Sequence, residues 1–69
     1  MRVKVDMKSD ALYFRLCEDE IEDSEEVSSG IIIDYNKEGK VVGIEILGIK
    51  DRFPLEELSN MKVEIPTIA

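Results

Sequence analysis

Apolar and polar residues alternate in two stretches near the start of the chain, residues 2–6 and residues 12–17. This period of two is typical of half-buried β-strands. The link between the stretches contains Asp6, Ser9 and Asp10. Such side chains hydrogen-bond nearby backbone amides and favour a turn over continuation of a strand. The first part of the chain therefore predicts a β-hairpin.

Residues 30–47 hold the densest β-branched stretch and predict a second hairpin, turning at Asn36-Lys37-Glu38-Gly39. Gly39 suits this turn because glycine adopts positive φ without a Cβ clash. The pairs expected across the loop are Tyr35 with Lys40, Ile33 with Val42, and Ile31 with Ile44. One face then carries Ile31, Ile33, Tyr35, Val42, Ile44 and Ile46, and the other carries Ile32, Asp34, Val41, Gly43, Glu45 and Leu47. A slip of one residue would spread charge over both faces, so the pattern selects this pairing.

Three further segments have weaker patterns. Residues 18–27 are mostly acidic, with two large apolar residues, and predict at most a short strand at a sheet edge. Residues 53–58 predict a short helix, because Pro54 suits a first helical position and glutamates follow it. Leu55 and Leu58, three apart, give that helix an apolar edge to lie on the sheet. Alternation over residues 61–65 favours a last strand, which Pro66 would end.

These elements predict an α+β fold: an antiparallel β-meander of about four strands with a short C-terminal helix packed on one face. We find no internal repeat and no linker that divides the chain, so residues 1–69 are expected to form a single domain. The face bearing Ile32, Val41 and Leu47 is too apolar to be fully solvated. Three alternatives could cover this face: the C-terminal helix, a second copy of the chain or a different protein.

Length and cysteine content limit how the fold can be stabilised. A chain of 69 residues hides only about 60% of the surface that its unfolded form exposes. One cysteine and no histidine leave neither an intramolecular disulfide nor a structural metal site of histidine and cysteine. Self-association remains available, so a homodimer or larger homo-oligomer is expected.

Nine basic against sixteen acidic residues give a net charge of −7, which repels nucleic acid and anionic lipid. Neither nucleic acid nor a membrane is therefore an expected partner. The N-terminus has no signal-peptide pattern and no apolar run approaches the length of a membrane span. The expected location is the cytoplasm.

Seven acids and no base lie between residues 18 and 26. One interpretation is a solvated connector or edge strand whose charges discourage aggregation. The other is an acidic surface that docks a basic protein, with Glu22, Asp23, Glu25 and Glu26 as the candidate partner-binding residues.

Four other acids, Asp6, Asp10, Asp34 and Glu45, stand next to apolar strand positions, and clustered carboxylates can hold Mg²⁺ or Ca²⁺. Catalysis would depend on them and a metal-bound water, because the chain has no histidine base. Turn formation accounts for the first two and a solvated polar face for the other two. We therefore assign no catalytic, cofactor-binding or metal-binding residue and expect no enzyme. Tyr13 and Tyr35 are both expected to pack in the core or an interface.

Four segments occur in a recognisable order: Asp6 and Asp10 followed by Ala11-Leu12-Tyr13, then Ser24-Glu25-Glu26-Val27, Gly30-Ile31-Ile32-Ile33-Asp34-Tyr35 and Gly43-Ile44-Glu45-Ile46-Leu47. This order resembles the YuzE-like family of small prokaryotic domains of unknown function. The resemblance covers about residues 1–50 and leaves residues 51–69 as helix and tail. It implies no established activity. Genes of such domains look recurrently placed beside small basic proteins that resemble toxin ribonucleases, which implies an antitoxin role.

The function expected from these observations is a non-catalytic protein-interaction domain, antitoxin-like, that binds a small basic partner protein. The first alternative is a structural homo-oligomer without a heterologous partner. The second is a hydrolase that uses carboxylates and a metal.

Overall fold

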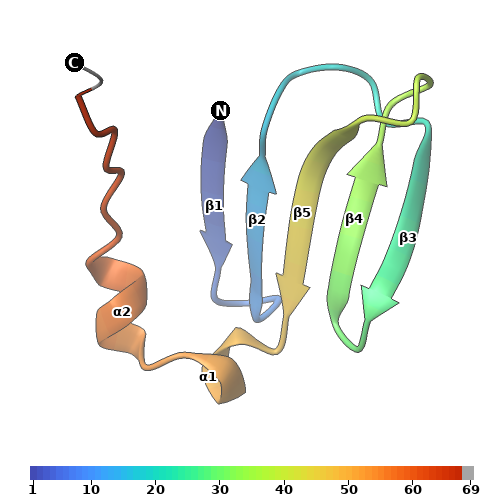
Figure 1. Cartoon of the computed structure of the whole chain (residues 1–69). Coiled ribbons are helices and arrows are strands. Elements are labelled where there is room, and N and C mark those ends of the chain that lie inside the picture. Colours follow the sequence, from blue (N-terminus) through green and yellow to red (C-terminus); the bar gives the residue numbers. More distant parts are fainter. Residues whose placement is uncertain (68–69) are drawn as a thin grey trace.

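The structure, a computed structural model, describes residues 1–67; residues 68–69, the end of the expected single domain, lie outside the described part. The described residues form one five-stranded antiparallel sheet followed by two short helices (Figure 1). The strands are β1 (Arg2–Asp6), β2 (Ala11–Arg15), β3 (Asp23–Ser28), β4 (Ile31–Tyr35) and β5 (Val41–Leu47), and the helices are α1 (Ile49–Arg52) and α2 (Leu55–Ser59). The α+β prediction is confirmed, with five strands in place of about four. None of the described helices is long and apolar enough to cross a membrane.

The strands lie in the order β1-β2-β5-β4-β3. Strand order departs from chain order at one point, where β2 pairs with β5. The segment after β2, residues 16–22, therefore passes over one end of the sheet to reach the far edge (Figure 1). The sheet has two outer strands as a result: β1 at one edge and β3, from the acidic segment, at the other.

The turn between β4 and β5 is the predicted one. Gly39 has φ +79°, and its amide donates to the Asn36 carbonyl at 3.0 Å. The Asn36 side-chain oxygen accepts from the amides of Glu38 and Lys40 at 3.0 and 2.9 Å. These bonds account for the tight closure of the loop.

The predicted pairing across this turn is wrong. The observed pairs are Ile31 with Ile46, Ile33 with Ile44, and Tyr35 with Val41. The loop includes Lys40, and an irregularity beside Tyr35 places an extra residue in β5. For the isoleucine pairs the shift is two residues, so each isoleucine keeps its predicted face.

The two faces of the sheet differ sharply in character. The apolar face carries Val3, Val5, Leu12, Phe14, Ile31, Ile33, Ile44 and Ile46, as the strand register requires. The polar face carries Arg2, Lys4, Asp6, Tyr13, Arg15, Asp34 and Glu45.

Helix α2 lies against the apolar face. Phe53, Leu58 and Met61 border a hollow of about 240 Å³ together with Leu12, Phe14 and Ile46 of the sheet. Leu58 is half-buried as predicted, but Leu55 is 56% exposed and does not border the hollow. The helix therefore does not cover the side on which Ile32, Val41 and Leu47 were expected to need a cover.

Helix α1 was not predicted from the sequence. Its start is held by Asp10, whose carbonyl accepts from the amides of Gly48 and Ile49 at 2.8 and 3.3 Å. The Asp10 carboxylate also accepts from the Lys50 amide at 2.9 Å. These bonds fix the end of β5 against the first hairpin and bury Ile49 completely.

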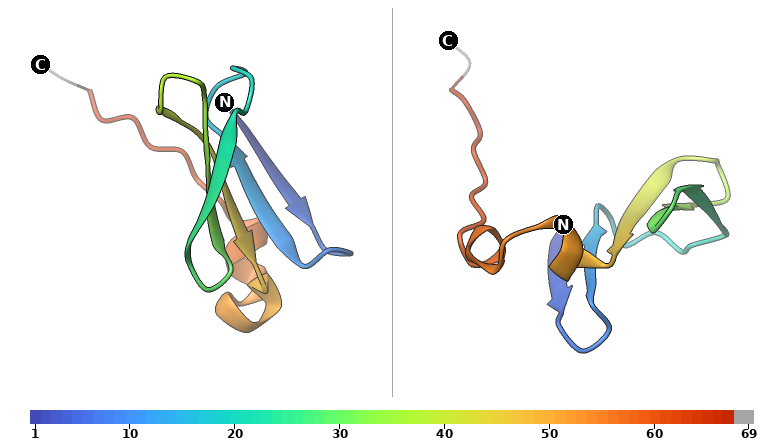
Figure 2. Two further views of the ribbon diagram at one scale, coloured as in Figure 1. Left: turned by 90° about the vertical axis from the view of Figure 1, so that its right-hand side faces the viewer. Right: turned by 90° about the horizontal axis from the view of Figure 1, so that it is seen from below.

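The buried hydrophobic core is small: among the described residues it consists of Leu12, Val42 and Ile49. The strand predicted over residues 61–65 does not form. This segment is extended and exposed, and it leaves α2 without pairing to the sheet (Figure 2).

Candidate functional site

The four predicted partner-binding acids lie together at one edge of the sheet. We call Glu22, Asp23, Glu25 and Glu26 the acidic edge. All six residues of β3 are exposed, and the outer side of this strand has no neighbouring strand in the described structure. The Glu22 amide donates to the Tyr35 carbonyl at 2.8 Å and holds the start of the segment on β4. The acidic segment is thus an ordered edge strand over residues 23–28.

Carboxylates of the acidic edge project on both sides of the sheet. Glu25 pairs with Ile33 and shares its face, whereas Glu26 pairs with Ile32 and shares the opposite face. Glu26 also accepts a hydrogen bond from the Gly30 amide at 3.0 Å, across an irregularity at Val27. A molecule that approaches this edge therefore meets negative charge above and below the strand.

The other edge of the sheet carries a small excess of positive charge. Strand β1 presents Arg2, Lys4 and Asp6 on the polar face. In the sequence, residues 1–17 hold four bases and two acids, whereas residues 18–69 hold five bases and fourteen acids. Net charge is therefore segregated, with a basic first hairpin and an acidic remainder.

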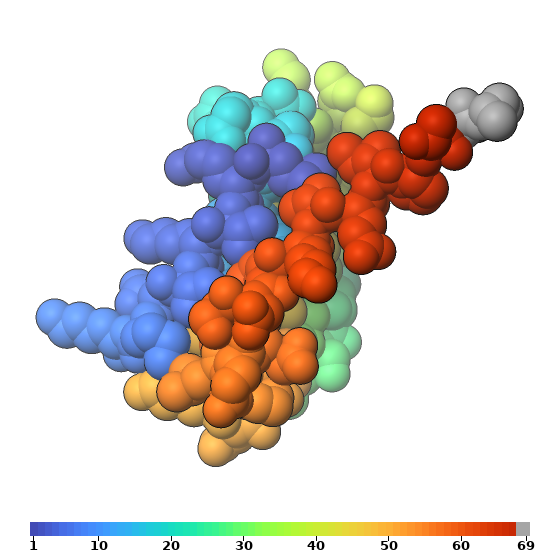
Figure 3. Space-filling view, turned by 90° about the vertical axis from the view of Figure 1, so that its left-hand side faces the viewer, coloured from blue at the N-terminus to red at the C-terminus, as the bar shows by residue number. Residues whose placement is uncertain are grey.

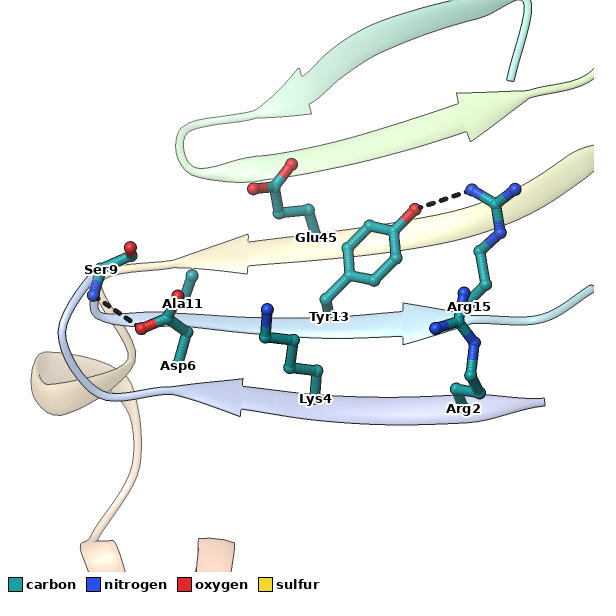
Figure 4. Close-up of a pocket in the computed structure, with 8 residues that line it drawn as sticks. All are labelled: Arg2, Lys4, Asp6, Ser9, Ala11, Tyr13, Arg15 and Glu45. Carbon is teal, nitrogen blue, oxygen red and sulfur yellow. Dashed lines mark hydrogen bonds between the residues drawn. The ribbon is translucent and has the colours of Figure 1, made fainter. Parts of the chain in front are cut away.

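A shallow groove of about 380 Å³ lies on the polar face (Figure 4). It is lined by Arg2, Lys4, Asp6, Ser9, Ala11, Tyr13, Arg15 and Glu45. The Arg15 guanidinium donates to the carbonyls of Cys17 and Asp19 at 2.8 and 2.6 Å, and to the Tyr13 hydroxyl at 3.3 Å. The bond to Tyr13 raises the pKa of Arg15 above its ordinary value.

Arg2, at the end of this groove, makes two hydrogen bonds of 2.9 Å to the Glu18 carboxylate. This pairing lowers the pKa of Glu18 below its ordinary value. Both arginines of the groove are thus already engaged by groups of the chain itself. Lys4 is then the cation of the groove for which no side-chain hydrogen bond is seen among the described residues.

Asp34 lies at the centre of a buried hydrogen-bond network. Only 5% of this residue is exposed, and its two carboxylate oxygens accept from the Tyr13 hydroxyl at 2.9 Å and the Ser24 hydroxyl at 2.6 Å. The prediction of a solvated Asp34 is wrong. Buried polar groups are stable only when bonded in this way.

Gly43 makes the network possible. Tyr13 on β2 and Asp34 on β4 are separated by β5. Asp34 pairs with Gly43, and Tyr13 pairs with Glu45, two residues further along β5. A Cβ atom on Gly43 would come within 2.6 Å of the Tyr13 hydroxyl and 3.0 Å of the Asp34 carboxylate. Because glycine has no side chain, the tyrosine can reach across β5. The sequence signal for this network was the glycine in an otherwise bulky strand.

The remaining acids that were considered as metal ligands have separate environments. Asp6 caps the first turn, since its carboxylate accepts from the amides of Ser9 and Lys8 at 3.0 and 3.1 Å. These bonds, chiefly the one from Ser9, lower the pKa of Asp6. Asp10 holds the start of α1, and Glu45 lines the groove. Within residues 1–67, no three acidic or cysteine side chains are grouped so that they could hold a metal ion.

The chain belongs to the DUF2283 family of proteins of unknown function, whose family model matches residues 2–50. The match spans the whole sheet and ends within α1, so α2 and the tail lie beyond it. No curated protein matches the chain, and no solved structure does. The family description names no activity, so the function has to be argued from the geometry.

Proposed function

We propose that this chain is a non-catalytic interaction domain that binds a small basic protein through the acidic edge. The observation that carries the proposal is the placement of three exposed carboxylates along an edge strand, with Glu22 directly before it, where the outer side of the strand has no neighbour in the described structure. The YuzE-like resemblance, with its basic gene neighbours, supports an antitoxin-like role in the cytoplasm.

An edge strand offers a row of free backbone donors and acceptors to which another strand can be added. The carboxylates of Glu25 and Glu26 select which strand is added. A second copy of β3 would bring like charges together, whereas a basic partner finds complementary charge on both sides of the strand. The β1 edge, which carries Arg2 and Lys4 against Asp6, offers the same partner no excess of negative charge. The difference between the two edges therefore directs a basic protein to β3.

The first partner to test is the protein encoded by the neighbouring gene, mixed with the full chain. Hydrogen exchange should show new protection at the amides of β3 that face away from β4, and none at β1. A complex that protects β1 or the groove, and leaves β3 unchanged, would contradict the proposal.

A charge-neutralised variant provides the second part of this experiment: Glu22→Gln, Asp23→Asn, Glu25→Gln and Glu26→Gln. Its matched control neutralises one aspartate and three glutamates elsewhere, with Asp51→Asn, Glu56→Gln, Glu57→Gln and Glu64→Gln. Both variants have the same net charge, so only position differs. Affinity should fall in the first variant and remain close to wild type in the control. Equal loss in both would mean that net charge alone attracts the partner.

The alternatives differ in the support they receive. A carboxylate-metal hydrolase gains none from the described residues, because their acids are not grouped for a metal. Homo-oligomerisation is favoured by a separate observation, the incomplete cover of the apolar face.

A further inference from the structure

Much of the apolar face has no cover in a single chain. Leu58 of α2 borders an open hollow of about 240 Å³ together with Leu12, Phe14 and Ile46 of the sheet. Beyond the helix, Val3 is 46% exposed, and Ile31 and Ile33 are only half-buried. The eight residues of this face on β1, β2, β4 and β5 are all apolar, and the charged Glu25 lies only at its outer edge, on β3. A surface of this kind is typical of an interface.

The accessible area gives the size of the missing cover. A compact monomer of 7.9 kDa is expected to expose about 4,400 Å² by the scaling of area with mass. The chain exposes 5532 Å², which leaves an excess of about 1,100 Å² over that scaling. A stable dimer of ordinary size buries about 800 Å² on each partner. The excess is therefore enough for one dimer interface.

The dimensions of the molecule also indicate that one chain alone is less compact than a typical domain of its length. Its radius of gyration is 13.6 Å, against about 11 Å for a compact chain of this length. Its shortest extent is 18 Å, since most of the sheet forms a single layer. Stable domains usually pack two layers around a core.

The C-terminal arm, residues 61–65, does not pair with any strand of the described sheet. Val63 and Ile65 are each 87% exposed and lie on alternate positions of an extended segment. Figures 1 and 2 show the arm running clear of the strands, and Figure 3 shows its side chains protruding from the molecule. Alternation of apolar side chains is the pattern of a segment that lies on an apolar surface.

We infer that a second copy of this chain covers the apolar face, and that the arm of each copy packs on the sheet of the other. A second copy is favoured over a different protein because the core of one chain is only three residues, so the cover is needed whenever the chain is folded. A second copy of the chain is also available whenever the protein is made, whereas a different protein need not be. This inference adds a self-association surface to the proposed function and does not depend on it, because the acidic edge lies on an outer strand.

Sedimentation equilibrium of the full chain over a wide concentration range tests the inference. The mass should reach twice 7.9 kDa at micromolar concentration and remain there. The variant V63K/I65K should weaken dimerisation by about tenfold or more, since it removes two apolar contacts. Its own fold should be unchanged, because both side chains are almost fully exposed in one chain. A control of equal charge, E64Q/T67K, should dimerise like wild type.

Val3→Lys, on the sheet, should weaken the dimer in the same way, with circular dichroism as the check on folding. A monomer at all concentrations would overturn the inference, as would a dimer that resists V63K/I65K. A mass that keeps rising with concentration would also overturn it, because it indicates head-to-tail pairing of the β1 and β3 edges. Loss of partner binding in the acidic-edge variant leaves the dimer mass unchanged, so the two proposals fail separately.

Discussion

Replacing Gly43 by alanine should destabilise the fold far more than a single methyl group suggests. The added Cβ would lie 2.6 Å from the Tyr13 hydroxyl and 3.0 Å from the Asp34 carboxylate. The first of these distances is too short for any real contact, so the tyrosine has to move away. Its movement breaks the 2.9 Å hydrogen bond to Asp34, a residue that is only 5% exposed.

The magnitude follows from two costs and one gain. A buried acceptor that loses a partner costs about 1–3 kcal/mol. Overpacking of a well-filled site costs about 1–3 kcal/mol, and alanine recovers about 0.4–1 kcal/mol through the lower entropy of the unfolded chain. The two costs less the gain leave a loss of about 1–6 kcal/mol, with a middle value of roughly 3 kcal/mol. A domain of this length has a total stability of roughly 3–10 kcal/mol, so the variant should be close to unfolding.

Urea unfolding at a fixed protein concentration measures this loss, and a double-mutant cycle with Tyr13→Phe assigns it. Phenylalanine removes the hydroxyl that the new Cβ would meet, so Gly43→Ala should cost at least about 1 kcal/mol less in the Tyr13→Phe background. Equal stability of Gly43→Ala and wild type would refute the reasoning. A loss that is the same with and without the Tyr13→Phe substitution would show that the hydroxyl is not the obstacle.

Two further variants test the turns. Gly39→Val places a β-branched residue at φ +79° and should cost about 1–2 kcal/mol in urea unfolding, with no steric contribution because the space around Gly39 is open; stability equal to wild type would disprove the turn assignment. Asp6→Asn should be less stable than wild type at neutral pH, because the folded state lowers the pKa of Asp6 and so favours its charged form. The difference in stability between wild type and Asp6→Asn should be complete above about pH 4, the ordinary aspartate range, and should disappear as the pH falls through the lowered pKa. If the difference persists in acid, the loss of stability comes from the shape of the side chain and not from its charge.

The strands of the two hairpins could be predicted from the sequence because period-two alternation is typical of half-buried strands. The same alternation over residues 61–65 forms no strand, since that segment does not pair with the sheet. The turn at Gly39 could be predicted for a local reason, the need for positive φ. The residue pairs across this hairpin could not be predicted from the sequence. The loop includes Lys40, and β5 holds an irregularity near Val41 that no local sequence pattern indicates. The four-residue helix α1 escaped prediction because it depends on Asp10, forty residues from its bonding partner Lys50.

Asp34 shows why site chemistry is harder to predict than strands. An aspartate between isoleucine and tyrosine in a strand is expected to face water. Its burial results from three strands that meet only in the folded sheet: Tyr13 from β2, Ser24 from β3 and the gap at Gly43 in β5. The acidic edge, by contrast, could be located from the sequence, because a run of like charges has few places in a small fold other than an edge.

The most direct test of the proposed function is the rate at which the chain associates with the product of the neighbouring gene, provided that this protein is small and basic, measured by stopped flow over a range of salt concentrations. Exposed charges steer encounter over about one Debye length, so they act on the association rate more than on dissociation. Neutralising Glu22, Asp23, Glu25 and Glu26 should slow association at low salt and flatten its salt dependence, while the control at Asp51, Glu56, Glu57 and Glu64 keeps the steep dependence of wild type. An unchanged association rate at low ionic strength would contradict the account and leave β3 as a solvated edge that only prevents aggregation.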